Sequence, residues 1–204
     1  MTKTHSAPKK FSQELEEWLN SNQPKTLLSL VRFSEDKSFA VTIMMLMFLS
    51  ALPIPTGGIT HVLEIIAFLV AFEMLIGLKT IWLPKSARKI KLGKTFQGKV
   101  IPAMMARIQW MEQRSSHKFK WVFNIPLVDR LTALVMIVFI VVAFLAPPFS
   151  GLDTLPALGV VTICLAIILD DIRALIAGTI IGSLGVFVAI GLGELLIRLI
   201  NHIF

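Results

Sequence analysis

The residues best able to carry chemistry in this sequence are ionisable side chains inside an apolar run, residues 59–78. They are His61, Glu64 and Glu73. His61 and Glu64 are three positions apart, so a helix places them on one face, where they can form a pair. Burying an ionisable group among apolar residues is expensive and often functional. Glu64 is predicted either to bind a proton or cation or to form a hydrogen bond between helices. His61 is either pH-sensitive or an ordinary histidine at the helix end. Glu73 is close enough to the end of the run to lie at an interface.

Two breaks interrupt the apolar runs, "PIPTGG" at residues 53–58 and "PPFSGLD" at residues 147–153. Broken helices present free backbone N–H and carbonyl groups that can bind ions within a membrane. On this interpretation the ligand-binding residues are Thr56, Gly57, Gly58, Thr60, Glu64, Ser150, Gly151, Asp153 and Thr154. The alternative is two tight turns near the outer interface, where proline simply ends a helix. Both interpretations stay open, with the turn preferred.

The elements that must position these residues are apolar helices. The chain has 204 residues, 55% of them hydrophobic, and a mean hydropathy of +0.76, which is typical of an integral membrane protein. The single cysteine, Cys164, excludes a disulfide framework. No cleavable signal peptide is expected, because the first 37 residues are polar and charged. The predicted fold is an all-α, polytopic helical membrane protein with two repeated helical hairpins and a glycine-rich final transmembrane helix.

Polar segments separate the apolar runs. An amphipathic helix is expected near Leu15 and Trp18, against the membrane or the bundle, with Ser12 capping its start. A basic segment, residues 79–120, has eleven Lys or Arg and one acid, Glu112. Within it, a second amphipathic helix around Met104 is expected to lie on the membrane surface. The predicted divisions are 1–37 (N-terminal segment), 38–78 (first hairpin), 79–129 (basic linker), 130–170 (second hairpin) and 171–204 (final helix).

The final helix carries a stripe of small residues at spacings of three and four. Its members are Gly178, Gly182, Gly185, Ala189 and Gly193. Such stripes allow helices in membranes to approach closely. Packing within the bundle is the preferred use, and homodimerisation is the alternative. Just before this helix, Asp171 is placed to cap it; alternatively, Asp170 or Asp171 pairs with Arg173 or with the basic segment.

An internal repeat is predicted because the two breaks align at an offset of 94. Pro53 then matches Pro147, and Gly57 matches Gly151. The positive-inside rule places the N-terminal segment and the basic linker in the cytoplasm. Both hairpins then point outward in the same orientation, as a parallel repeat, and the C-terminus lies outside.

The sequence contains no recognisable catalytic constellation. No Ser-His-Asp order, phosphate-binding glycine loop or pair of catalytic acids is present, so no enzyme activity is expected. No metal site and no cofactor are predicted. The basic segments are expected to contact anionic lipid headgroups of the bilayer, because apolar runs flank them, and not nucleic acid.

Several segments, taken in order, resemble the ExoD family of exopolysaccharide-synthesis proteins. They are "SQELEEWL", "LLSLVRF", "ALPIPTGG", "GLKTIWLPK", "ARIQWMEQR" and "FLAPPFSGLDTLPALGVVTICLAIILDD". Two positions depart from the expected pattern: "SSHKFK" replaces a Pro-Arg pair, and "DD" at Asp170 replaces an acid flanked by Arg or Glu. The resemblance implies a bacterial inner-membrane protein linked to exopolysaccharide synthesis or export. The alternative is a small transporter of an ion, a proton or a lipid-linked anion that uses the two breaks.

Overall fold

The described part of the chain is all-helical, which confirms the predicted fold class at this level. The computed structural model describes residues 11–22, 24, 26, 29, 37–52, 59–82, 98, 101–113, 121–123, 125–147 and 150–203, with backbone alone for residues 59 and 193–203. Its helices are α1 (Phe11–Asn20), α3 (Ser38–Phe48), α4 (Ile59–Leu75), α6 (Ile101–Glu112), α7 (Pro126–Leu145), α8 (Thr154–Leu169) and α9 (Ile172–Ile203). The prolines at the start of α7 and near the start of α6 fit the first turn of a helix, where the missing N–H leaves no bond unmade.

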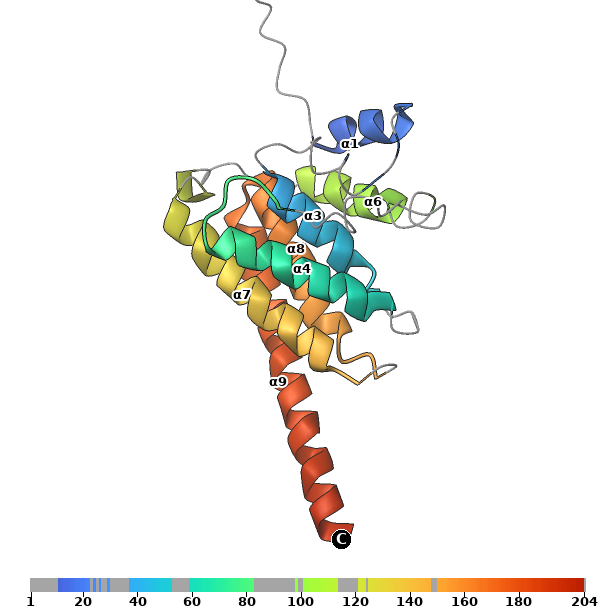
Figure 1. Ribbon diagram of the computed structural model, residues 1–204, viewed down its shortest axis with the longest axis vertical. Helices are drawn as coiled ribbons and strands as arrows, with labels where there is room; N and C mark the ends of the chain where they lie inside the picture. Colours follow the sequence, from blue (N-terminus) through green and yellow to red (C-terminus); the bar gives the residue numbers. More distant parts are fainter. Residues whose placement is uncertain are drawn as a thin grey trace, which may run out of the picture.

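Helices α3, α4, α7 and α8 form the core of the molecule (Figure 1). α3 packs against α4 and α8, and α7 packs against the same two helices, so the contacts close into a ring. α8 is apolar on every side and is buried along most of its length between α3, α7 and α9. A helix with apolar residues all round is stable only when it is surrounded in this way.

Glycines bring α8 and α9 into close contact. A Cβ atom added to Gly159 of α8 would lie 2.5 Å from the Cα of Gly182 in α9, which no real side chain tolerates. The other close approaches are Gly178 to Ile163, Gly182 to Phe139 and Gly185 to Pro156. Ala189 is half-buried, and Gly193 is described by its backbone alone. The first three members of the predicted stripe are therefore packed within one chain.

Three helices expose large apolar side chains along regular stripes. The stripes comprise Val62, Ile65, Leu69 and Phe72 on α4; Leu127, Leu131, Leu134, Val138, Val141 and Leu145 on α7; and Ile176, Ile180, Leu184 and Phe187 on α9. Spacings of three and four keep each stripe on one face of its helix. Water-soluble monomers rarely expose continuous apolar surface of this extent. The outer surface of these helices is therefore suited to apolar surroundings.

Two described helices are long and apolar enough to cross a membrane. They are α7, with 20 residues, and the segment Ile172–Leu192 of α9, with 21. At about 1.5 Å per residue, each spans the roughly 30 Å of a hydrocarbon core. α7 begins at Pro126, before the boundary predicted at residue 130. The C-terminal half of α9 extends beyond the other helices (Figure 1).

α1 and α6 pack together at one end of the bundle (Figure 1). Leu15 and Trp18 of α1 are buried, as are Ile101, Met104 and Ile108 of α6. The apolar face of α6 was expected to rest on the membrane surface. It is instead covered by protein, because α1 and α8 both contact this helix.

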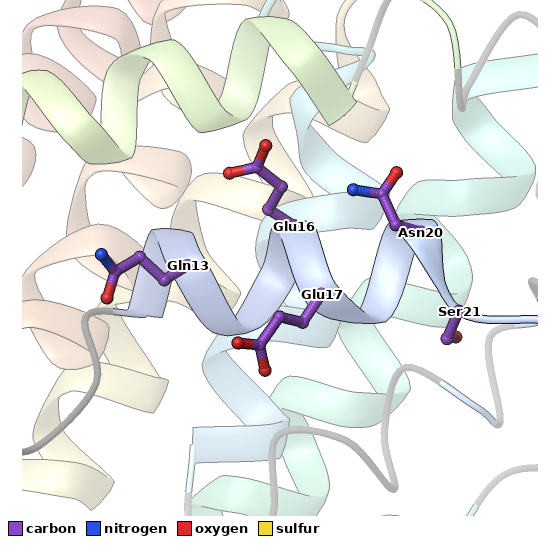
Figure 2. A pocket seen from close by; sticks show the side chains of 5 residues that line it. All are labelled: Gln13, Glu16, Glu17, Asn20 and Ser21. Carbon is purple, nitrogen blue, oxygen red and sulfur yellow. The ribbon is translucent and has the colours of Figure 1, made fainter. Parts of the chain in front are cut away.

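Glu112 of α6 fastens the start of α1. Both the backbone N–H and the hydroxyl of Ser12 donate to its carboxylate, at 3.0 Å and 2.6 Å. A carboxylate at a helix start satisfies a free N–H and complements the helix dipole. Ser12 was expected to cap its own helix. Its hydroxyl instead donates to Glu112, and the Glu112 carboxylate accepts the N–H at the start of the helix. Polar side chains on the outer side of α1 line a shallow surface hollow (Figure 2): Gln13, Glu16, Glu17, Asn20 and Ser21.

Two aspartates fix the corner between α8 and α9. Asp170 has a left-handed backbone (φ 51°) that ends α8. Its carboxylate pairs with Lys37 at 3.1 Å, and Lys37 also donates to the carbonyl of Ile168. Asp171 accepts the backbone N–H of Arg173 at 2.9 Å and so caps α9. The expected cap is therefore present at Asp171. Asp170 forms an ion pair, but its partner is Lys37 and not Arg173 or the basic segment.

Candidate functional site

A buried polar cluster joins the end of α3 to the first turns of α4. Ser50 lies in the turn that follows α3, and its hydroxyl donates to Glu64 Oε1 at 2.7 Å. His61 Nδ1 lies 3.0 Å from Glu64 Oε2, one helical turn away on the same face of α4. Glu64 is 0% exposed, whereas the side chain of His61 is 31% exposed. We call these three residues the Glu64 cluster.

A recess of about 220 Å³ adjoins the Glu64 cluster. Its lining residues are Glu64, Ile65, Phe68, Ile140, Val141 and Phe144. Glu64 is the ionisable residue of this lining, and Ile65, Val141 and Phe144 belong to the exposed apolar surface. The rings of Phe144 and His61 meet edge to face, with centroids 5.4 Å apart. The recess therefore connects a buried carboxylate with the apolar outer face between α4 and α7.

Among the described residues, the buried Glu64 carboxylate has polar partners alone. Burying a carboxylate is strongly unfavourable unless it is neutralised or paired. Each carboxylate oxygen of Glu64 has a hydrogen-bonding neighbour, but no Lys or Arg pairs with this carboxylate in the described part of the chain. The described partners of this buried carboxylate are therefore a hydroxyl and an imidazole. Among the described residues, no group of three His, Cys, Asp or Glu side chains could hold a metal ion.

The described residues of the second break, 147 and 150–153, are joined by hydrogen bonds within the break. The hydroxyl of Ser150 donates to the carbonyl of Pro147 at 2.6 Å and accepts the N–H of Leu152 at 3.2 Å. Gly151 has φ +70°, a conformation that favours glycine. The side chain of Asp153 makes no capping hydrogen bond to α8. The hydroxyl of Ser150 is therefore bonded within the break itself.

The structure does not bring all the predicted ligand-binding residues together in one site. Thr56, Gly57 and Gly58 lie outside the described residues. Thr60 is buried in the first turn of α4, and Thr154 is half-buried at the start of α8. No hydrogen bond or ion pair links Ser150, Asp153 or Thr154 to the Glu64 cluster among the residues described.

Sequence reasoning missed Ser50 as a partner of Glu64. The two residues are fourteen positions apart and meet only because α3 and α4 fold back on each other. A hydroxyl at the end of an apolar run was the available signal. Glu73, at the other end of α4, accepts the backbone N–H of Trp82 at 2.8 Å and so holds the segment that follows the helix.

Comparison with known proteins assigns the chain to a family. A family model described as "Exopolysaccharide synthesis, ExoD" matches residues 11–191, from the first residue of α1 into α9. The chain belongs to the ExoD family. Membership associates this ExoD protein with exopolysaccharide synthesis and with the membrane.

One relative matches this ExoD protein along almost its whole length. It is an uncharacterized protein of Synechocystis sp., 26% identical over 202 residues, which cover 96% of this chain and 89% of the relative. No solved structure matches the chain.

Proposed function

We propose that this ExoD protein is a polytopic bacterial inner-membrane protein that takes part in exopolysaccharide synthesis or export and is not itself an enzyme. The exposed apolar stripes of α4, α7 and α9 support the polytopic arrangement. Three separate helices with such faces are better accommodated by lipid than by water. α3 and α8 are shorter than a full span, and most of their side chains are buried among the other helices.

An internal repeat would account for the arrangement of the four core helices. Residues 59–75 of α4, moved by the offset of 94, become 153–169, and α8 is Thr154–Leu169. The same offset places α3 within α7. The contacts α3–α8 and α4–α7 then correspond to each other. α3 and α7 also run in the same direction, away from the end that holds α1 and α6 (Figure 1), which favours a parallel repeat.

The orientation follows from charge. α1 from the N-terminal segment and α6 from the basic linker lie at one end of the molecule, and the C-terminus lies at the other (Figure 1). Segments rich in Lys and Arg stay on the cytoplasmic side. The end with α1 and α6 is therefore the cytoplasmic end, and both hairpins point outward.

The Glu64 cluster supports a second, more specific activity, the movement of a proton or small cation. The observation that carries it is the completely buried carboxylate of Glu64, whose described partners are a hydroxyl and an imidazole. Intramembrane carboxylates of this kind mark ion and proton pathways. If Glu64 only joined two helices by a hydrogen bond, a neutral amide at this position would serve almost as well. Replacing the carboxylate by an amide therefore distinguishes ion movement from a structural role.

Replacing Glu64 by Gln keeps the size of the side chain and its bond from Ser50 but removes the charge. We expect exopolysaccharide output to fall to the level of a strain lacking the gene, with normal membrane abundance. Glu16→Gln, on the exposed surface of α1, is the matched control. Proton and sodium flux into liposomes containing the purified protein tests the transport activity directly. Normal output from the Glu64→Gln strain would remove Glu64 from the proposal, and lost output without flux in the wild-type protein would reject transport alone.

A further inference from the structure

A second concave surface, separate from the Glu64 cluster, lies between the end of α3, α6, α8 and the start of α9. Its volume is about 770 Å³, within the range of roughly 300–1,000 Å³ found for pockets that hold whole small ligands. We call it the α6–α9 groove. We propose that this groove binds a membrane lipid that carries a phosphate headgroup.

The floor and walls of the α6–α9 groove are apolar. Leu158, Val161 and Leu165 lie on one face of α8, at spacings of three and four. Ala174, Ala177 and Ile181 follow the same spacings on α9. The small alanine side chains keep the space between the helices open. An apolar trough that follows two neighbouring helices suits a hydrocarbon chain, because burial of such a chain is favourable and needs no directional partner.

Two exposed arginines line the α6–α9 groove together with one acid, Asp171. Arg173 comes from the first turn of α9, and Arg107 comes from α6; both are exposed and line the groove. Neither guanidinium forms an ion pair with another residue in the described part of the chain. Asp171, the acid of the lining, already caps α9 through the N–H of Arg173. Two arginines of a mostly apolar groove are thus available to an anion.

This combination selects one class of occupant. Guanidinium groups bind phosphate oxygens through paired hydrogen bonds, which are stronger than neutral ones. Trp110 of α6 also lines the groove and is 56% exposed, and tryptophan favours the level of lipid headgroups. Free phosphate would leave the apolar trough unused, and an uncharged lipid would leave both arginines unused. A phosphate-bearing lipid uses both parts of the groove.

Binding of fluorescent phosphatidic acid and of a short polyprenyl phosphate to the purified full-length protein in detergent tests this inference. We expect the double substitution Arg107→Ala and Arg173→Ala to weaken binding of both probes at least about tenfold, because two charge-assisted contacts are lost. Ala177→Trp fills the trough and should weaken binding similarly while keeping both arginines. Arg130→Ala, an exposed arginine of α7 that does not line the groove, is the matched control. Circular dichroism confirms that each variant is folded.

Competition experiments separate the possible sources of the anion. The inference predicts that inorganic phosphate and the uncharged polyprenol compete poorly, and that phosphatidylcholine competes less well than phosphatidic acid. Equal affinity for polyprenol and polyprenyl phosphate would overturn it, as would full competition by inorganic phosphate or unchanged binding in both folded groove variants. Glu64→Gln should bind the lipid normally, so failure of the transport proposal would leave this result unaffected.

Discussion

Replacing Gly159 by alanine tests the close crossing of α8 and α9. The added Cβ would lie 2.5 Å from the Cα of Gly182, 2.7 Å from its backbone N and 3.0 Å from the carbonyl oxygen of Gly178. All three atoms belong to the backbone, so no side-chain rotation relieves the overlap. The two helices must therefore separate by about 0.9 Å, the difference between 2.5 Å and the 3.4 Å at which ordinary contact begins.

The expected loss of stability is moderate and measurable. Overpacking a well-packed interior typically costs about 1–3 kcal/mol, and a wider gap also weakens the contacts of the neighbouring side chains. Alanine in place of glycine within a helix recovers roughly 0.5–1 kcal/mol. The net loss for Gly159→Ala is therefore about 1–2 kcal/mol, a factor of roughly 5–30 in the ratio of folded to unfolded protein.

Unfolding of the purified protein by increasing SDS in mixed micelles, followed by circular dichroism, measures this loss. Gly191→Ala is the matched control, because it lies in α9 but its added Cβ would meet nothing within 4 Å. We expect Gly191→Ala to unfold at the same SDS fraction as the wild type or a higher one. The reasoning is refuted if Gly159→Ala is as stable as the wild type, or if both variants lose equal stability.

Three further predictions concern contacts outside the glycine crossing. Glu112→Gln weakens the two hydrogen bonds from Ser12, so limited proteolysis should cut near α1 faster than in the wild type. The SDS fraction at the unfolding midpoint should barely change. An unchanged rate of cutting would contradict this prediction. Lys37→Met removes the partner of the Asp170 carboxylate and of the Ile168 carbonyl and should lower stability by about 1 kcal/mol. Lys79→Met, at an exposed lysine, is the control. Cys164 is 0% exposed, so a maleimide should label it only after SDS unfolding, and rapid labelling of the native protein would show that α8 is not packed as described.

Local patterns predicted the helices well because they depend on neighbouring residues. Proline ended the apolar run close to the end of α7, and the apolar spacing around Leu15 and Met104 marked α1 and α6. α3 ends at Phe48, before the break that begins at Pro53. What covers the apolar face of an amphipathic helix was harder to predict, because lipid and protein both provide suitable apolar surroundings. The face of α6 was therefore assigned to the membrane surface, although it packs inside the protein.

The amino-acid sequence by itself determined the all-helical class, the approximate positions of the main apolar helices and the presence of ionisable groups in an apolar setting. Only the tertiary structure decided which partners those groups have. Ser50 reaches Glu64, and Lys37 reaches Asp170, through contacts between helices. Gly159 likewise meets Gly182 only because α8 packs against α9. Helix formation is governed by residues within a few positions of each other, whereas these pairs depend on how whole helices pack, and one sequence pattern is compatible with several packings.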